Sequence, residues 1–258
     1  MRKGCRERKS IRMAIDFGSL SQDRRLGRAL RWPLRLIPRD LVVPVMQGPL
    51  RGWRWVVGSA NHGCWLGSYE IAQHRAFAEE IRPGQVVYDL GANVGFYTLI
   101  AARRAGSTGR VVAFEPLERN LRYLRRHLAV NGVTNTTVVA AAVSGTAGVA
   151  GLDASRGPSM ARLSRQRADS VEVVTLDHVA RARRLPDPNV MKIDVEGGEL
   201  DVLRGGEQLL RRARPTLFVS THSTDLHRGC AAWLRDAGFV CEEASGDLLV
   251  ARPPDSRA

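Results

Sequence analysis

One segment constrains the fold of this 258-residue chain more than any other: Val86-Val87-Tyr88-Asp89-Leu90-Gly91-Ala92-Asn93-Val94-Gly95. The pattern predicts a buried apolar strand that runs into a glycine-rich turn, and the turn opens a helix. Units of this kind build sheets of mostly parallel strands, whose ligands bind beyond the carboxyl ends of the strands. Gly91 and Gly95 have no Cβ, so the backbone of this turn could approach a ligand closely.

Strands and helices are predicted to alternate along most of the chain. The predicted strands are residues 53–57, 85–90, 110–115, 136–143, 171–175, 190–195 and 215–221, and the predicted helices are residues 71–81, 95–104, 117–131, 176–184, 199–212 and 224–237. Residues 154–169 are polar and predict a surface loop. Residues 239–243 and 248–251 flank a Ser-Gly-Asp turn and predict an antiparallel hairpin. The expected fold class is therefore α/β, with a Rossmann-like, doubly wound, mostly parallel sheet that ends in a C-terminal antiparallel hairpin.

The basic residues are concentrated near the N-terminus. Residues 1–58 hold about fourteen Lys and Arg against four Asp and Glu, so they carry about +10 of the formal net charge of +13. Such an arm could contact nucleic acid, make weak contact with an anionic membrane surface, or be a solvated extension. We favour the solvated extension and expect no nucleic-acid partner, because no nucleic-acid-binding motif accompanies the charge. We divide the chain into a basic extension (1–55), one domain (56–251) and a short tail (252–258).

The remaining bulk features argue against a membrane-spanning or disulfide-bonded protein. No run reaches the ~18 apolar residues that a membrane span needs, and no apolar stretch typical of a secretory signal follows the basic N-terminus. The four cysteines are far apart in the sequence and form no Cys-x-x-Cys pair, which argues against a zinc cluster. Reduced thiols and the lack of a leader predict a cytoplasmic location.

The glycine turn discriminates between two kinds of nucleotide ligand. Dinucleotide sites use Gly-x-Gly-x-x-Gly with a pyrophosphate at the helix N-terminus, whereas this turn reads Asp-x-Gly-x-x-x-Gly. Asp89 would repel a diphosphate but suits a ligand with ammonium and sulfonium charges, namely S-adenosylmethionine. Glu115 ends the next predicted strand, where an acid can accept hydrogen bonds from both ribose hydroxyls. The alternative is a purely structural turn capped by Asp89 or Asn93.

Several segments together resemble the FkbM-type methyltransferase family. They are Tyr88-Asp89-Leu90-Gly91-Ala92-Asn93-Val94-Gly95-Phe96-Tyr97-Thr98, Val112-Ala113-Phe114-Glu115-Pro116, Val174-Thr175-Leu176-Asp177, and Met191-Lys192-Ile193-Asp194-Val195-Glu196-Gly197-Gly198-Glu199, which runs on to Val202-Leu203-Arg204-Gly205. The upstream Trp65-Leu66-Gly67-Ser68-Tyr69-Glu70 also looks like the segment that precedes this domain in many members. The resemblance covers roughly residues 56–251. It implies the class I methyltransferase fold, S-adenosylmethionine as cofactor, and usually O-methylation in natural-product or glycan biosynthesis.

The resemblance also assigns cofactor-binding roles. Asp89, Gly91, Asn93 and Gly95 would form the loop on the methionine side of the cofactor, Glu115 would hold the ribose, and Glu70 would close over the cofactor beside Tyr69. The alternative for Tyr69 and Glu70 is that they only begin the next helix. Related methyltransferases often carry an acid at the end of the third strand. This chain instead reads Ala140-Ala141-Ala142-Val143-Ser144 there, so adenine recognition would use backbone groups near Val143 and Ser144.

Candidate catalytic residues follow the predicted strands at 190–195 and 215–221. Strand alternation puts Lys192, Asp194 and Glu196 on one face, where three buried charges would be costly without a partner or ligand. We expect Asp194 near the transferring methyl group, Lys192 and Glu196 orienting the acceptor, and His222 as general base. A structural alternative has Glu196 as a helix cap and Lys192 neutralising Asp194. An Asp194–Glu196–His222 metal site is a further alternative, but no ligand spacing compels it and we predict no metal.

The sequence therefore predicts an S-adenosylmethionine-dependent methyltransferase that acts on a hydroxyl of a small molecule or glycan. An NAD-linked oxidoreductase is disfavoured by the glycine spacing, by Asp89 and by the terminal hairpin. A non-catalytic cofactor-binding module, or a nucleic-acid-binding module that uses the basic N-terminus, is disfavoured by the intact acidic residues. Methylation of nucleic acid would favour an Asn/Asp-Pro-Pro-Tyr type motif after the fourth strand, and Asp194-Val195-Glu196 does not match it.

Overall fold

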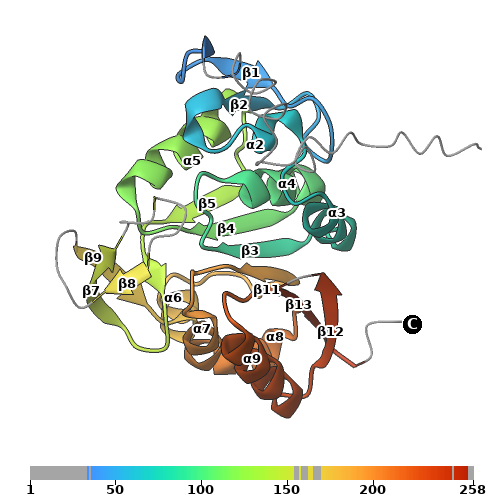
Figure 1. The fold of residues 1–258 in the computed structure, drawn as a ribbon. Coiled ribbons are helices and arrows are strands. Elements are labelled where there is room, and N and C mark those ends of the chain that lie inside the picture. The colour runs from blue at the N-terminus through green and yellow to red at the C-terminus, as the bar shows by residue number, and fades with distance from the viewer. Residues whose placement is uncertain are drawn as a thin grey trace, which may run out of the picture.

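The computed structural model describes residues 34, 36–153, 157, 162–164, 170–245 and 247–254. Most of the predicted basic extension and most of the predicted loop at 154–169 lie outside the described residues. The described chain forms three layers, with a central sheet between two sets of helices (Figure 1).

The central sheet has seven strands and confirms the predicted fold class. Its order is β12 (Val240–Ser245), β13 (Leu248–Arg252), β11 (Thr216–Ser220), β10 (Val190–Ile193), β3 (Val86–Leu90), β4 (Arg110–Phe114) and β5 (Thr136–Val139). The strands from β11 to β5 are parallel, whereas β13 runs antiparallel to β11 and to β12. The C-terminal hairpin therefore forms as predicted and closes one side of the sheet.

The helices divide into two groups that cover opposite faces of this sheet. One group contains α3 (Ile71–Glu80), α4 (Phe96–Ala105) and α5 (Glu118–Val130); the other contains α6 (Leu176–Ala182), α7 (Glu199–Gly205), α8 (Glu207–Ala213) and α9 (Thr224–Asp236). Each group buries its apolar side in a separate cluster of core residues. None of the helices in the described part of the chain is long and apolar enough to cross a membrane.

The predicted helix at 199–212 is wrong in one respect, because the structure breaks it into α7 and α8. Two glycines lie at the break, and each lies against a neighbouring element. A Cβ at Gly205 would overlap the carbonyl oxygen of Ser144, and one at Gly206 would lie 2.8 Å from the side chain of Leu176. The close approach of the two neighbours explains why small residues occupy this point.

The predicted third strand at 136–143 is also wrong beyond Val139. The segment continues as β6 (Ala142–Val143), which pairs in parallel with β9 (Ser170–Val174) and not with β4. With β7 (Gly148–Asp153) and β8 (Arg162–Ser164) these strands form a separate four-stranded sheet in the order β6-β9-β7-β8. Because the whole run from Val138 to Val143 is apolar, its hydropathy does not reveal that two sheets share it.

A short N-terminal hairpin packs against the α3–α5 side of the molecule. It consists of β1 (Val42–Pro44) and β2 (Arg54–Val56), joined antiparallel. Val45, Leu50 and Trp55 are buried in the same core cluster as α3, α4 and α5. The boundary expected between residues 55 and 56 therefore falls inside a paired strand, and the folded body includes the hairpin.

His127 on α5 ties this hairpin to the turn that follows β3. The fully buried ring donates from Nδ1 to the carbonyl oxygen of Val94 at 2.7 Å and accepts from the amide of Val56 at Nε2, at 3.0 Å. It also stacks on Trp55, with 4.0 Å between the ring centroids. Burial lowers the pKa of His127 to about 4, so the ring is neutral at physiological pH, as the two hydrogen bonds require.

We expect His127→Phe to destabilise the protein. The substitution keeps an aromatic ring against Trp55 but leaves the Val94 carbonyl and the Val56 amide without partners. An unpaired buried polar group costs about 1–3 kcal/mol, so the free energy of unfolding should fall by about 2–4 kcal/mol in equilibrium urea denaturation. His178→Phe, at an exposed position of α6, is the control and should change it by less than about 0.5 kcal/mol. Equal midpoints for the two variants would contradict a stabilising role for the bridge.

Candidate functional site

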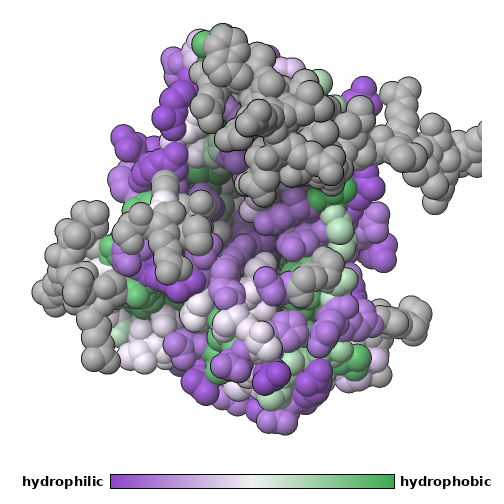
Figure 2. Space-filling view, in the orientation of Figure 1, coloured by the Kyte–Doolittle hydropathy of each residue, from purple (hydrophilic) through white to green (hydrophobic). Residues whose placement is uncertain are grey.

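The site lies where the order of the central sheet reverses. From β3 the chain proceeds to β4 and β5 on one side, whereas β10 and β11 lie on the other, and ligands of such sheets bind at this switch point. A cavity of about 720 Å³ opens there. Figure 2 shows a recess between the upper and lower parts of the molecule, walled by both polar and apolar residues.

Eight of the eleven predicted site residues line this cavity. They are Asp89, Gly91, Asn93, Glu115, Ser144, Lys192, Asp194 and Glu196. The other three, Glu70, Gly95 and His222, are not part of its wall but each contacts a residue that is. Residues far apart in the sequence are thus brought together at one edge of the sheet, as the parallel arrangement predicts.

Asp89 at the end of β3 is a buried carboxylate with built-in partners. It accepts a hydrogen bond of 2.6 Å from the hydroxyl of Thr98 on α4. Burial raises the pKa of Asp89, while the nearby charge of Lys192 and the bond from Thr98 act in the opposite direction. The carboxylate thus lies at the cavity wall, where a cationic ligand would stabilise its ionised form.

The two glycines of the turn are required by different neighbours. Gly91 has φ of 80°, and a Cβ there would overlap the carbonyl oxygen of Asp194, so the end of β10 packs directly against the turn. Gly95 has φ of 96°, and a Cβ would lie 2.5 Å from the Leu124 side chain on α5. Gly95 therefore serves helix packing, and the predicted close approach to a ligand does not apply to it, because it lies outside the cavity wall.

Glu115 follows β4 and organises the neighbouring loop. Its carboxylate accepts from the amides of Asn93 and Leu117, both at 2.8 Å, and from the side chain of Asn120 at 3.3 Å. Burial raises the pKa of Glu115 to about 7, and the three hydrogen bonds limit the rise. The acid predicted to hold the ribose is therefore held rigidly at the cavity wall and titrates near neutral pH.

The small second sheet, which the sequence did not predict, borders the cavity. Its strands supply Val143, Leu152 and Leu163, and Ser144 follows β6. The amide of Ser144 donates to the carbonyl oxygen of Val174 at 3.0 Å, so this group is already used within the sheet. The Ser144 amide is therefore not free to contact adenine, and recognition of adenine by other backbone groups near Val143 and Ser144 stays a prediction.

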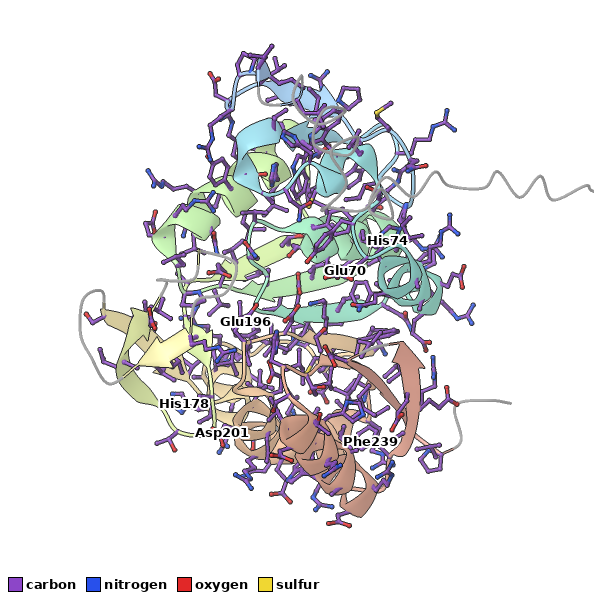
Figure 3. The ribbon with its side chains drawn as sticks, viewed as in Figure 1. Glu70, His74, His178, Glu196, Asp201 and Phe239 are labelled. Atoms are coloured by element: carbon purple, nitrogen blue, oxygen red, sulfur yellow. The ribbon has the colours of Figure 1, made fainter. Side chains whose placement is uncertain are left out.

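Glu70 lies at the start of α3, in the part of the ribbon that Figure 3 labels beside His74. Its carboxylate accepts a 2.7 Å hydrogen bond from the hydroxyl of Tyr97, and the neighbouring Tyr69 lines the cavity. Glu70 thus reaches the site through Tyr97 rather than by facing the cavity.

Lys192 and Asp194 form a buried ion pair at the end of β10. The Nζ of Lys192 lies 2.7 Å from Asp194 Oδ2 and 4.4 Å from the centroid of the Tyr97 ring. Burial by itself would lower the pKa of Lys192, but the charges of Asp194 and Asp89 outweigh it and raise the pKa. A lysine that is almost fully buried therefore remains charged at the cavity wall.

Strand alternation does not account for the position of Glu196, because β10 ends at Ile193. Glu196 has φ of 58°, a left-handed backbone conformation that costs a non-glycine residue about 1–2 kcal/mol. Glu70 and Asn93 also have positive φ, so three of the described non-glycine residues with this strain lie at the site. Strain of this kind concentrates where a side chain must be held in one place. Figure 3 shows Glu196 between the upper and lower halves of the ribbon.

His222 lies behind the cavity wall, among three carboxylates. Its Nε2 lies 3.5 Å from Asp194 Oδ1 and 3.3 Å from Glu196 Oε2, and its Nδ1 lies 3.1 Å from Glu199 Oε1. Hydrogen bonds to Glu196 and Glu199 raise the pKa of His222 to about 10. At neutral pH the ring therefore carries its second proton, and the predicted role of His222 as a general base is corrected: an imidazolium cannot accept the proton.

Sequence reasoning missed the role of Glu199. This fully buried residue begins α7, and its Oε1 accepts from the amides of Val195 and Gly197, both at 3.1 Å, as well as from His222. It thereby shapes the loop that presents Glu196. The sequence signal available was an acid at the first position of a helix, where its side chain can bond back to free amides.

A metal could in principle use part of this cluster. Among the described residues, Asp194, Glu199 and His222 offer ligand atoms that all lie within 4.8 Å of one another. This set contains Glu199 in place of the Glu196 of the alternative considered above. Lys192 and the loop amides already supply positive charge to the two carboxylates. The buried Oε2 of Glu199, however, has no hydrogen-bond partner among the described residues, and the absence of a metal stays a prediction.

The comparison with known proteins identifies the family. The sequence profile of the methyltransferase FkbM domain matches residues 89–241, which is more than half of the chain. This chain belongs to the FkbM methyltransferase family. The matched range contains every predicted catalytic residue and all predicted cofactor-binding residues except Glu70.

One known methyltransferase and one solved structure are examples of proteins similar to this FkbM-family chain. The hexuronic acid methyltransferase AglP of Haloferax volcanii is 27% identical over 135 residues, which cover 51% of this chain and 54% of that protein. The crystal structure of a methyltransferase FkbM from Methylobacillus flagellatus is 16% identical, with a TM-score of 0.51 over 74% of this chain and 55% of that one. The chain thus spans about half the length of either protein, and the second likeness concerns the fold alone.

The cofactor of this FkbM-family methyltransferase is S-adenosylmethionine, and the cavity fits it. The cavity lies beyond the β3 turn, and carboxylates of Asp89 and Glu115 line it together with the strained backbone of Asn93. Asp89 would repel a pyrophosphate at the turn, whereas it would attract a sulfonium and an ammonium. The NAD-linked alternative is thereby set aside.

We expect cofactor binding to weaken at mildly acidic pH because of Glu115. Its carboxylate is ionised above a pKa of about 7 and loses accepting capacity as the pH falls below it. From pH 8 to pH 6 the ionised fraction falls about tenfold, so the dissociation constant of S-adenosylhomocysteine should rise by up to about tenfold in calorimetric titration. Glu115→Gln should bind more weakly and lose this pH dependence, whereas the exposed Glu118→Gln should retain it. A wild-type affinity that is constant over this range would contradict the role of Glu115.

Proposed function

We propose that this methyltransferase transfers the methyl group of S-adenosylmethionine to a hydroxyl of a small molecule or glycan, in secondary-metabolite or polysaccharide biosynthesis. The observation that carries the proposal is the presence of Asp194, Glu196 and Lys192 in the same cavity wall as Asp89 and Glu115. Acceptor chemistry and cofactor binding therefore share one cavity. The relation to a protein named for hexuronic acid methylation supports a sugar as acceptor.

The cofactor supplies the electrophilic methyl group, so the protein's task is to hold both reactants and to manage one proton. We assign Asp89, Gly91 and Asn93 to the methionine side of the cofactor and Glu115 to the ribose. Ser144 would border the adenine from the second sheet. These assignments agree with the burial of Asp89 and with the hydrogen bonds that fix the carboxylate of Glu115.

On the acceptor side we assign proton removal to Asp194. The hydroxyl proton would pass to its carboxylate as the oxygen bonds to the methyl carbon, and the sulfur would leave with the electrons of the broken carbon–sulfur bond. Lys192 and Glu196 would orient the acceptor. His222, protonated and held by Glu199, would keep the carboxylates of Asp194 and Glu196 side by side, which its 3.5 and 3.3 Å contacts support.

Calorimetric titration tests the cofactor part of the proposal. The protein should bind S-adenosylmethionine and S-adenosylhomocysteine with micromolar affinity, about −8 kcal/mol, and should not bind NAD. Asp89→Ala should abolish binding because it removes the carboxylate at the turn, whereas Asp187→Ala, on the exposed Arg212 ion pair, should not. Full affinity in Asp89→Ala would remove this residue from the site, and binding of NAD alone would overturn the function.

Variants of the acceptor side test the proton assignment. With a methyl-labelled cofactor and a panel of hydroxylated sugars, Asp194→Asn should lower turnover by about 10²–10⁴-fold and leave cofactor binding intact. His222→Ala should lower turnover less, because it removes a positioning contact. Asp201→Asn is the matched control, since Asp201 also lines the cavity but pairs with Arg204 at 3.5 Å. Undiminished turnover in Asp194→Asn would exclude Asp194 as the proton acceptor.

A further inference from the structure

The acidic side chains of the cavity wall all have partners within the chain. Asp89 is bonded to Thr98, and Glu115 accepts three hydrogen bonds. Asp194, Glu196 and Asp201 lie within 4.0 Å of the cationic groups of Lys192, His222 and Arg204. Asp194, Glu196 and Asp201 therefore have cationic partners before any ligand binds, whereas Asp89 and Glu115 are held by uncharged donors and suit the cationic groups of the cofactor.

Three arginines of the same wall differ in this respect. Arg39, Arg119 and Arg162 line the cavity, and in the described ranges none of them forms an ion pair with a carboxylate. The cofactor brings only one carboxylate to the site, so it does not supply a partner for each of the three. The wall therefore holds guanidinium groups that have no carboxylate partner in the described part of the chain.

Two of these arginines are attached to the same short segment, residues 57–59. The amide of Gly58 donates to the carbonyl oxygen of Arg39 at 2.6 Å, and a Cβ on Gly58 would lie 2.5 Å from the Cβ of Arg39. Arg119 donates to the carbonyl oxygen of Ser59 at 3.1 Å. Both side chains therefore border one corner of the cavity.

The guanidinium of Arg119 is also held in place by uncharged groups. It donates to the side-chain oxygen of Asn120 at 3.1 Å and lies 5.0 Å from the centroid of the Tyr123 ring. These contacts fix its orientation without neutralising its charge. A planar guanidinium held in this way is suited to bind a carboxylate or phosphate through two parallel hydrogen bonds.

We infer that the methyl acceptor carries an anionic group, a carboxylate or a phosphate, and that Arg39 and Arg119 bind it at the corner formed by residues 57–59. The inference rests on the proposed function, because it concerns the acceptor of that same site. Arg162, from the second sheet, adds positive charge to the same cavity. Arg39 and Arg162 are exposed to solvent, whereas Arg119 is half-buried, so a neutral acceptor would leave the Arg119 guanidinium in particular without an anionic partner.

The test uses the full chain with arginine side chains labelled with ¹⁵N, titrated with D-glucuronate, D-glucose 6-phosphate and D-glucose, with and without S-adenosylhomocysteine. We expect the Nε–H signals of Arg39 and Arg119 to shift with one or both anionic sugars and not with glucose. The two anionic probes separate a carboxylate from a phosphate.

Arg39→Gln and Arg119→Gln should each weaken anionic-sugar binding by about tenfold, the value of one lost charge-assisted contact. Arg125→Gln, on the same helix as Arg119 but paired with Glu118, should not.

Equal responses to glucose and to the anionic sugars, or no response from either arginine, would overturn the inference. It would also be overturned if both variants lost affinity for S-adenosylhomocysteine alone, because the arginines would then bind the carboxylate of the cofactor. Calorimetry with S-adenosylhomocysteine on the same sample separates the two proposals. Retained cofactor binding without anion selectivity contradicts only the inference, whereas absent cofactor binding contradicts the proposed function.

Discussion

The site depends on the junction between β3 and β10, where buried charges meet a close backbone contact. Lys192 is almost fully buried, and only the carboxylates of Asp194 and Asp89 make its charge tolerable there. Removing one partner from such a cluster leaves an uncompensated charge in a medium of low dielectric, which costs several kcal/mol. Gly91 adds a steric condition, because any side chain at that position would collide with the backbone of Asp194. The cofactor turn and the acceptor side are therefore built against each other.

Each side of this junction is supported by a histidine in a different charge state. On the cofactor side, neutral His127 joins the turn at Val94 to the N-terminal hairpin, and burial lowers its pKa so that the ring does not take up a second proton. On the acceptor side, three carboxylates keep His222 protonated. The same side chain type thus serves as a neutral hydrogen-bond bridge in an apolar environment and as a cation in an acidic one. Both hold loops in place.

The acidic and the basic residues of the cavity wall also come from different parts of the fold. The acids that we assign to the cofactor lie at the ends of central parallel strands. Arg39 and Arg119 border the cavity beside residues 57–59, which follow the N-terminal hairpin. The second sheet adds another wall, with Arg162. Family membership covers the common part of this arrangement, residues 89–241. Arg39 and residues 57–59, which flank the hairpin and lie outside that range, border the part of the cavity where we place the anionic group of the acceptor.

The sequence by itself determined the sheet, its terminal hairpin and the residues that meet at the switch point, because strand periodicity, glycine spacing and the acids that end strands are local features. Four matters depended on tertiary structure. The apolar run through Val139 divides between two sheets, and the N-terminal hairpin joins the core. Gly95 packs against a helix rather than a ligand. The raised pKa of His222, which argues against a role as a base, also depends on tertiary structure, because the carboxylates around the ring come from α7 and from the loop after β10. Such distances arise only from packing, and no local pattern records them.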